Sequence, residues 1–128
     1  MREKPLILVV DDDTFLADVL DTKLTKAGFS VLKAYNGKEC CEIAKKEKPD
    51  LIILDLRMPI MDGAEALAKL KSDPDTKDIK VSILSLFNEW AGIKLTKETA
   101  VKLGAVDFME KSGDLEATVQ KVRSILSG

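Results

Sequence analysis

Short runs of mostly apolar residues alternate along the chain with longer stretches that mix apolar and polar residues. The runs are four to six residues long, which is the length of a buried strand. They span 6–10, 29–34, 50–54, 81–84 and 105–109. After each run, apolar residues recur every three or four positions, the period of an amphipathic helix. These helical stretches cover 14–27, the segment that follows 36–37, 64–71, 96–103 and 114–126.

Residues with special backbone preferences mark the ends of these segments. Gly28 and Gly104 follow helical stretches and suit a left-handed C-terminal cap. Asn36-Gly37 begins the second helix, and Asp13 is placed to cap the first. Residues 86–95 are expected to form a loop. Five strand–helix units predict an α/β fold with a doubly wound five-stranded parallel sheet and helices on both faces. With 128 residues, we expect one domain, 1–128.

Composition narrows the class of protein. Hydrophobic residues make up 45% of the chain and charged residues 33%, which is enough apolar material for a full core. The formal charge is −2, from 20 basic and 22 acidic residues, so we expect neither direct nucleic-acid binding nor attraction to an anionic membrane. No apolar stretch is long enough for a membrane span, and no signal-peptide pattern begins the chain. We therefore expect a cytoplasmic protein without membrane insertion.

The cysteine and histidine content of the chain excludes several kinds of catalytic site. Cys40 and Cys41 are the two cysteines, and adjacent cysteines rarely bridge each other, so we expect helix-face thiols in a reducing compartment. The chain contains no histidine. This excludes a Ser-His-Asp triad, histidine acid–base catalysis and histidine metal sites within this chain.

Acidic residues follow two of the predicted strands directly. Asp55 ends the run 50–54, and Asp11-Asp12-Asp13 follows the run 6–10. In an open parallel sheet, the carboxyl ends of the strands are where ligands bind. Carboxylates that meet at this edge suggest a divalent-metal site, with one acid left for chemistry.

The residues at the strand ends carry a resemblance to a known family. Those that match are Asp11, Asp12, Asp55, Met58-Pro59, Asp62-Gly63, Ser85, Phe108 and Lys111. With these residues in this order, the chain resembles a response-regulator receiver domain of two-component signalling, similar to chemotaxis receivers, over nearly its whole length. The resemblance implies a flavodoxin-like sheet with strand order 2-1-3-4-5.

The resemblance also implies a role for each site residue. Asp55 would accept a phosphoryl group. Asp11, Asp12, Asp55 and the backbone carbonyl of Arg57 would hold Mg²⁺, which Mn²⁺ could replace. Lys111 would place a cation on the phosphoryl group, and Ser85 would donate a hydrogen bond to it. Such a protein is not an enzyme beyond its own phosphorylation and dephosphorylation.

The family's way of passing on a signal implies two switch residues and several partners. Ser85 would move toward the phosphoryl group, and Phe108 would swing inward. The face formed by the fourth helix, the fifth strand and the fifth helix would then change. The implied partners are a histidine kinase or phosphotransfer protein and an output protein that the sequence does not name. A phosphorylation-dependent homodimer is a further option.

This sequence departs from the family pattern near the switch residues. Leu86 stands where the family usually has a small residue and Phe87 follows it, and their bulk should restrict attacking water. We therefore expect a long-lived acyl phosphate, with Arg57, Leu86 and Phe87 as rate-tuning residues. Ser112-Gly113 follows Lys111, where the family usually has proline.

The segment between Ser85 and Lys111 is longer than is usual for the family. We place the extra length at Asn88–Ile93, which holds the only tryptophan, Trp90. Trp90 is either packed for stability or an anchor for a partner.

Three other interpretations remain. A phosphatase with an aspartyl nucleophile after the first strand would need Thr or Val where Phe15 stands. A flavin or nucleotide carrier would need a phosphate-binding loop, and no glycine-rich motif of that kind is present. The third alternative is a receiver-fold protein-interaction module that acts independently of phosphorylation.

Overall fold

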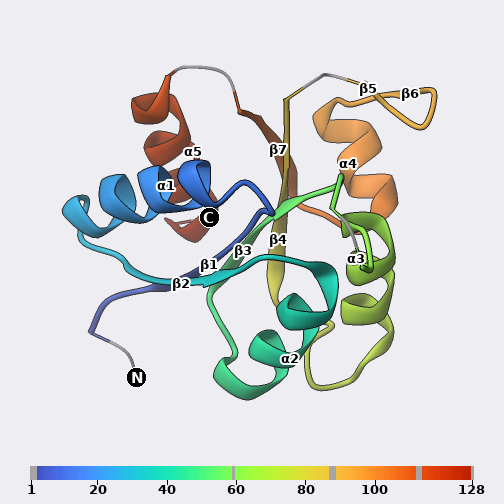
Figure 1. The fold of residues 1–128 in the computed structure, drawn as a ribbon, viewed down its shortest axis with the longest axis horizontal. Helices are drawn as coiled ribbons and strands as arrows, with labels where there is room; N and C mark the ends of the chain where they lie inside the picture. The colour runs from blue at the N-terminus through green and yellow to red at the C-terminus, as the bar shows by residue number, and fades with distance from the viewer. Residues whose placement is uncertain (1–2, 59, 87–88, 112–113, 128) are drawn as a thin grey trace.

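The computed structural model describes residues 3–58, 60–86, 89–111 and 114–127 (Figure 1). Its strands are β1 Leu6–Val10, β2 Ser30–Ala34, β3 Leu51–Asp55, β4 Lys80–Ser85, β5 Glu89–Trp90, β6 Ile93–Lys94 and β7 Asp107–Glu110. Its helices are α1 Thr14–Lys26, α2 Gly37–Glu47, α3 Gly63–Ser72, α4 Lys97–Leu103 and α5 Leu115–Ser127.

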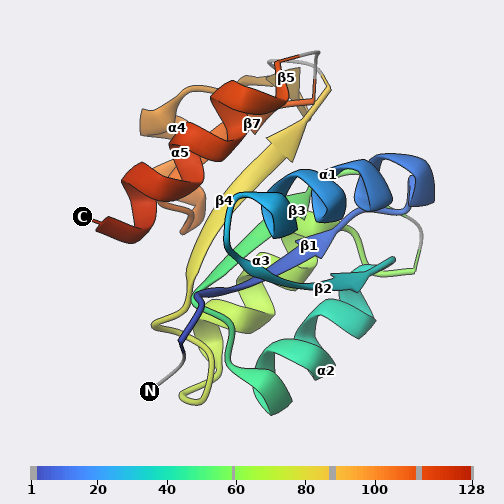
Figure 2. The same cartoon turned by 90° about the vertical axis from the view of Figure 1, so that its left-hand side faces the viewer.

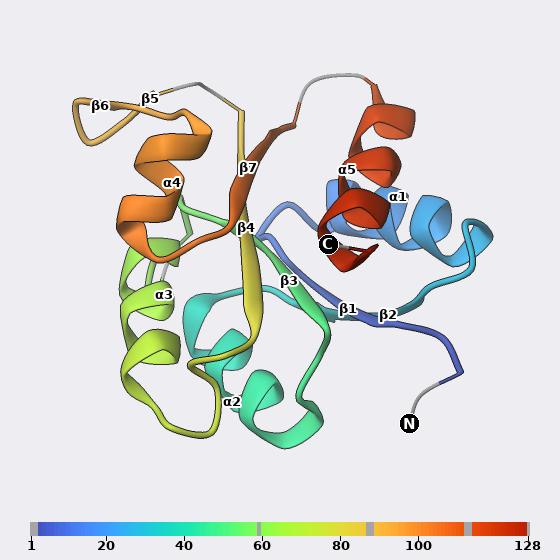
Figure 3. The same cartoon turned by 180° about the vertical axis from the view of Figure 1, so that it is seen from behind.

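The main sheet is parallel and has the order β2-β1-β3-β4-β7. Since β7 is the fifth strand of this sheet, the predicted order 2-1-3-4-5 is confirmed. Helices α1 and α5 cover one face, and α2, α3 and α4 cover the other (Figures 1 and 3). The chain therefore forms a three-layer α/β fold with a flavodoxin-like sheet.

Side-chain alternation along the strands divides the core between the two faces. Ile7 and Val9 pack under α1 and α5, whereas Leu8 and Val10 pack under α2 and α3. All five residues of β3 are buried, as expected for the central strand of a sheet covered on both sides. The central strand thus delivers Asp55 from the middle of the core to the carboxyl edge.

The helix ends confirm the predicted caps. The Asp13 carboxylate accepts a hydrogen bond from Leu16 N at 3.1 Å, which caps α1. Gly28 follows the C-cap of α1 with φ 101°, and Gly104 ends α4 with φ 104°. Both angles lie in the left-handed region that glycine adopts without strain.

The segment expected to be a loop contains a small antiparallel hairpin instead. Strands β5 and β6 form a two-stranded sheet of their own, with Trp90 opposite Ile93. The turn between them is Ala91-Gly92, with φ 50° and 78°, and two positive φ angles are what a tight hairpin turn requires. The Trp90 side chain lies outside the described residues, so its role stays a prediction.

The strand boundaries differ from prediction by one or two residues. Strand β4 begins at Lys80 and includes Ser85. Strand β7 begins at Asp107 rather than at Ala105 and ends at Glu110. In the part of the chain that the structure describes, no helix has the length and apolar character that a membrane crossing requires.

Candidate metal and phosphoryl-acceptor site

Two neighbouring strands bring the acidic residues together. Strands β1 and β3 pair in parallel, so their carboxyl ends lie side by side. Asp11 follows β1, and its N–H donates to Ala34 O of β2 at 3.1 Å. Asp11, Asp12 and Asp55 each offer a carboxylate oxygen, and these oxygens lie within 4.8 Å of one another. The structure thus places the three predicted acids in one cluster, which we call the acid cluster.

Lys111 lies against two members of the acid cluster. Its Nζ is 3.0 Å from Asp55 Oδ2 and 3.0 Å from Asp11 Oδ2. The contact with Asp55 is also a hydrogen bond, whereas Asp11 Oδ2 is buried and accepts no hydrogen bond of good geometry. The Lys111 N–H donates to Ser85 O at 2.8 Å, which fixes the end of β7 beside β4.

Burial and opposite charge compete in the acid cluster. Burial raises the pKa of Asp11, although the hydrogen bond from Asp13 N and the contact with the Lys111 ammonium oppose that shift. Burial lowers the pKa of Lys111, but its contacts with the carboxylates of Asp11 and Asp55 outweigh this effect, so the Lys111 pKa is raised overall. Lys111 is therefore a permanent cation at neutral pH.

The acid cluster has the chemistry of a divalent-cation site. When all three acids are ionised, three carboxylates and one ammonium leave a net charge of −2. Asp12 is exposed, which leaves the cluster open to solvent on one side, and Asp11 Oδ2 lacks a well-formed hydrogen bond. Hard oxygen ligands with room for water are what Mg²⁺ prefers. The residues present fit Mg²⁺.

The turn after β3 fixes the Asp55 carboxylate. Arg57 N donates to Asp55 Oδ1 at 3.0 Å, so each oxygen of Asp55 has a donor, Arg57 N for one and Lys111 Nζ for the other. Gly63 N donates to Leu56 O at 3.1 Å. A Cβ at Gly63 would overlap the Asp55 carbonyl oxygen and Leu56 Cα. The Asp62-Gly63 motif therefore needs glycine because helix α3 begins against the end of β3.

Backbone strain is concentrated in the same turn. Ile60 and Met61 have φ angles of 58° and 67°, and a β-branched residue rarely adopts this conformation. Met61 O accepts a hydrogen bond from Gly37 N at 2.9 Å, which ties the turn to the start of α2. This strain could not be predicted from the sequence, because Ile60 and Met61 are not residues that favour positive φ.

The remaining predicted residues lie around the acid cluster. Ser85 is buried at the carboxyl end of β4, and Asp55 pairs with the residue before it. Leu86 is 58% exposed. Phe108 is half-buried in β7 and packs against the core under α4. Phe87 and Ser112-Gly113 lie outside the described residues, so the predictions for them stay untested.

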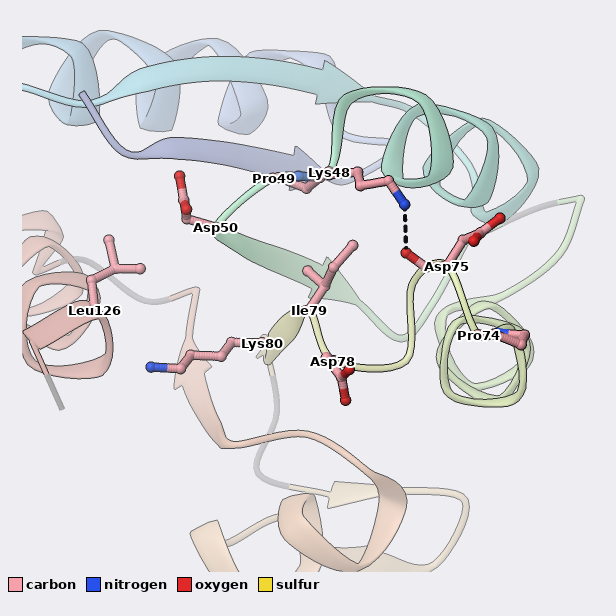
Figure 4. Close-up of a pocket in the computed structure, with 9 residues that line it drawn as sticks. All are labelled: Lys48, Pro49, Asp50, Pro74, Asp75, Asp78, Ile79, Lys80 and Leu126. Atoms are coloured by element: carbon pink, nitrogen blue, oxygen red, sulfur yellow. Dashed lines mark hydrogen bonds between the residues drawn. The ribbon is translucent and has the colours of Figure 1, made fainter. Parts of the chain in front are cut away.

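A separate pocket of about 430 Å³ lies at the opposite end of the sheet (Figure 4). It is lined by Lys48, Pro49, Asp50, Pro74, Asp75, Asp78, Ile79, Lys80 and Leu126. Lys48 Nζ donates to Asp75 O at 3.0 Å, and Lys80 Nζ donates to Ile125 O at 3.0 Å. Lys48 thus joins the end of α2 to the loop that contains Asp75, and Lys80 joins the start of β4 to α5, at the amino ends of the strands and away from the acid cluster.

The comparisons with known proteins agree with this geometry. The model of the response regulator receiver domain matches residues 7–123. Sporulation initiation phosphotransferase F of Bacillus subtilis is 34% identical over 126 residues, which cover 98% of this chain and 95% of that protein. Protein PilH of Pseudomonas aeruginosa is 33% identical, with coverage of 95% and 98%.

Other curated relatives are longer. The DNA-binding dual master transcriptional regulator RpaA of Synechocystis is 34% identical over 95% of this chain but only 49% of its own length. The chain spans about half the length of this and several other curated relatives.

Solved structures match the fold closely. The receiver domain of the Francisella response regulator 1452 superimposes with a TM-score of 0.83 at 27% identity, covering 97% of this chain and 98% of that one. The signal receiver domain of a histidine kinase from Syntrophus aciditrophicus has the same TM-score at 31% identity, with coverage of 97% and 91%.

Proposed function

The chain belongs to the response regulator receiver domain family, and we propose that it accepts a phosphoryl group from a histidine kinase or phosphotransfer protein onto Asp55. One observation carries the proposal. Asp55 is a buried carboxylate held between two donors, beside two further acids and a lysine. This is an oriented nucleophile next to the charges that phosphoryl transfer requires.

The reaction follows from the charges around Asp55. A carboxylate oxygen of Asp55 attacks phosphorus, the bond from phosphorus to the donor's imidazole nitrogen breaks, and the imidazole keeps the electron pair and later takes a proton. The product is an acyl phosphate. Arg57 N and Lys111 Nζ orient the carboxylate for attack, and the Lys111 ammonium offsets the charge that arrives with the phosphoryl group.

The metal would be held by Asp11, Asp12 and Asp55, with the Arg57 backbone carbonyl as a fourth ligand. Bound Mg²⁺ offsets the repulsion between a carboxylate and an anionic phosphoryl group. Asp12 is the exposed member of the acid cluster, so it provides the side from which a hydrated cation enters.

Ser85 and Phe108 would pass the signal onward. Ser85 is buried at the end of the strand next to β3, where its hydroxyl can turn toward a phosphoryl group on Asp55. Phe108 lies in β7, the strand on the other side of β4. A change at Asp55 therefore reaches the face formed by α4, β7 and α5 through one intervening strand.

Intact-protein mass spectrometry after incubation with acetyl phosphate tests the proposal. We expect a Mg²⁺-dependent gain of one phosphoryl group in the wild type and none in Asp55→Asn. Asp75→Asn is the matched control, because Asp75 is an exposed acid in the pocket at the far end of the sheet. Equal phosphorylation of Asp55→Asn and the wild type would exclude Asp55 as the acceptor.

The alternative is an interaction module that acts independently of phosphorylation. The observation in its favour is that Lys111 already pairs with both Asp11 and Asp55, so the acid cluster is partly neutralised by the protein itself. Under this alternative, the cognate kinase would transfer no phosphoryl group, and Asp55→Asn would leave partner binding unchanged.

A further inference from the structure

A lysine of α5 covers part of one edge of the main sheet, the edge formed by β7. Among the described residues, strand β7 pairs only with β4, so no described strand lies along its other side. Helix α5 lies beside this edge (Figure 2). Lys121 of α5 donates from Nζ to Phe108 O of β7 at 2.8 Å. A groove of about 380 Å³ between β7 and α5 is lined in part by Phe108 and Lys121.

Lys121 makes two further contacts at the same place. Its Nζ lies 5.3 Å from the centroid of the Phe108 ring, within the range of a cation–π interaction. It is also 3.5 Å from Asp107 Oδ1. That same carboxylate oxygen accepts a hydrogen bond from Phe108 N at 2.8 Å. We call Asp107, Phe108 and Lys121 the Lys121 cluster.

The Lys121 cluster holds Phe108 by its backbone and its ring together. The backbone N–H of Phe108 donates a hydrogen bond to the Asp107 carboxylate, and the backbone C=O of Phe108 accepts one from the Lys121 ammonium. An edge strand leaves such groups open unless a side chain covers them. The cation and the ring attract each other only while the ring keeps its present half-buried position.

We propose that Lys121 is a positioning residue that holds the ring of Phe108 in its present position and so sets how readily the ring can move. The proposal rests on the proposed function, in which Phe108 moves when Asp55 is phosphorylated. A ring that swings inward loses its contact with the Lys121 ammonium. Lys121 therefore favours the unphosphorylated arrangement and links α5 directly to the residue that responds to the acid cluster.

Lys121→Met tests the proposal, because methionine keeps the length of the side chain and loses its charge. Lys121→Arg is the conservative variant, since arginine can donate a hydrogen bond to Phe108 O, form an ion pair with Asp107 and stack on the Phe108 ring. Lys102→Met is the matched control, an exposed lysine of α4 that pairs only with the exposed Glu98 among the described contacts. Urea unfolding of each variant shows that it is folded.

The first measurement is ¹⁹F NMR of protein labelled with fluorophenylalanine, in which the Phe108 signal is assigned by its loss in Phe108→Leu. We expect this signal to be displaced in Lys121→Met and close to the wild-type position in Lys121→Arg and Lys102→Met. A general loss of stability would displace the signals of Phe15 and Phe29 as well. A Phe108 signal that stays in place in Lys121→Met overturns the proposal.

The second measurement is the affinity for beryllofluoride with Mg²⁺, a stable mimic of the phosphoryl group. Removal of a partly exposed cation–π contact should raise the affinity of Lys121→Met about fivefold, because less attraction opposes ring movement. An affinity equal to that of the wild type overturns the proposal. Failure of every variant to bind beryllofluoride, with the Phe108 signal still displaced in Lys121→Met, overturns the proposed function and leaves the positioning by Lys121 in place.

Discussion

At the scale of single residues, the acid cluster depends on one ammonium group. Lys111 contacts two carboxylates that are almost fully buried, those of Asp11 and Asp55. A buried charge that loses its partner keeps its desolvation cost without compensation. Lys111 thus has a structural role in addition to its proposed chemical one.

Lys111→Met should lower the free energy of unfolding in the absence of metal by about 2 kcal/mol, because Asp11 and Asp55 lose their common partner. Addition of Mg²⁺ should restore more stability to the variant than it adds to the wild type, since the cation takes over the neutralisation. Urea unfolding with and without Mg²⁺ measures both effects. A variant that is as stable as the wild type without metal would contradict this account.

Leu86 should slow hydrolysis of the acyl phosphate by restricting water, since it directly follows Ser85 at the edge where Asp55 lies. Leu86→Ala should shorten the lifetime on the order of three- to tenfold. The decay of the phosphorylated protein, followed by mass spectrometry, gives the rate. Ile93→Ala, which changes an exposed apolar residue of the hairpin, should leave it unchanged. A wild-type half-life of seconds that Leu86→Ala does not alter would reject this role.

At the scale of elements, the start of α3 and the end of β3 are packed backbone to backbone. Gly63 makes this contact possible because it has no Cβ, and the backbone that it contacts is that of Asp55 and Leu56. A change in the helix start is therefore transmitted to the nucleophile without any contact between the changed side chain and the phosphoryl group.

Gly63→Ala should cost about 2 kcal/mol of stability through overpacking and should also slow phosphorylation, because the added methyl group displaces Asp55. Gly28→Ala is the matched comparison. It places alanine at a φ of 101° with nothing within 4 Å, so it should cost about 1 kcal/mol and leave phosphorylation unaffected. Rates with acetyl phosphate and unfolding curves of both variants separate the two effects. Normal phosphorylation of Gly63→Ala would show that the strand end tolerates the extra carbon.

At the scale of the whole molecule, the core makes stability depend on pH. The Cys40 thiol is fully buried, and burial raises its pKa far above the ordinary value. In the unfolded chain this thiol ionises at about pH 8.5, whereas in the folded protein it stays protonated over the same range. Above that pH the unfolded state binds fewer protons, so stability falls as pH rises.

Between about pH 8.5 and pH 10.5, the free energy of unfolding should fall more steeply with pH in the wild type than in Cys40→Ala. The difference between the two slopes should reach about 1.4 kcal/mol per pH unit. The variant keeps Cys41, so the difference between the two proteins isolates one thiol. Urea unfolding at a series of pH values gives both slopes. Parallel slopes would mean that the Cys40 thiol has the same protonation state in the folded and unfolded protein over this pH range, which would contradict the prediction.

Most of the fold could be predicted because its signals are local. Apolar runs located the strands, and Asp13, Gly28 and Gly104 located helix ends, because each acts on the backbone beside it. The acids could be grouped because parallel strands end at one edge. Their proposed roles came from the family resemblance and still await experiment.

The features that sequence did not predict depend on distant partners. Nothing near Ile60 and Met61 indicates positive φ, because the conformation is held by Gly37 across the loop. The hairpin was missed because Ala91-Gly92 is a weaker turn signal than Asn-Gly. Lys121 resembles any exposed lysine until the fold places it over Phe108.

The hairpin of β5 and β6 also bears on how such a protein can diversify. Its two strands pair with no other strand in the described part of the chain, and the buried Leu95 packs into the core directly after them. Residues can be gained or lost at its turn without changing the register of the five-stranded sheet. A duplicated gene could therefore vary this one segment, acquire a new recognition surface, and inherit the ancestral chemistry intact.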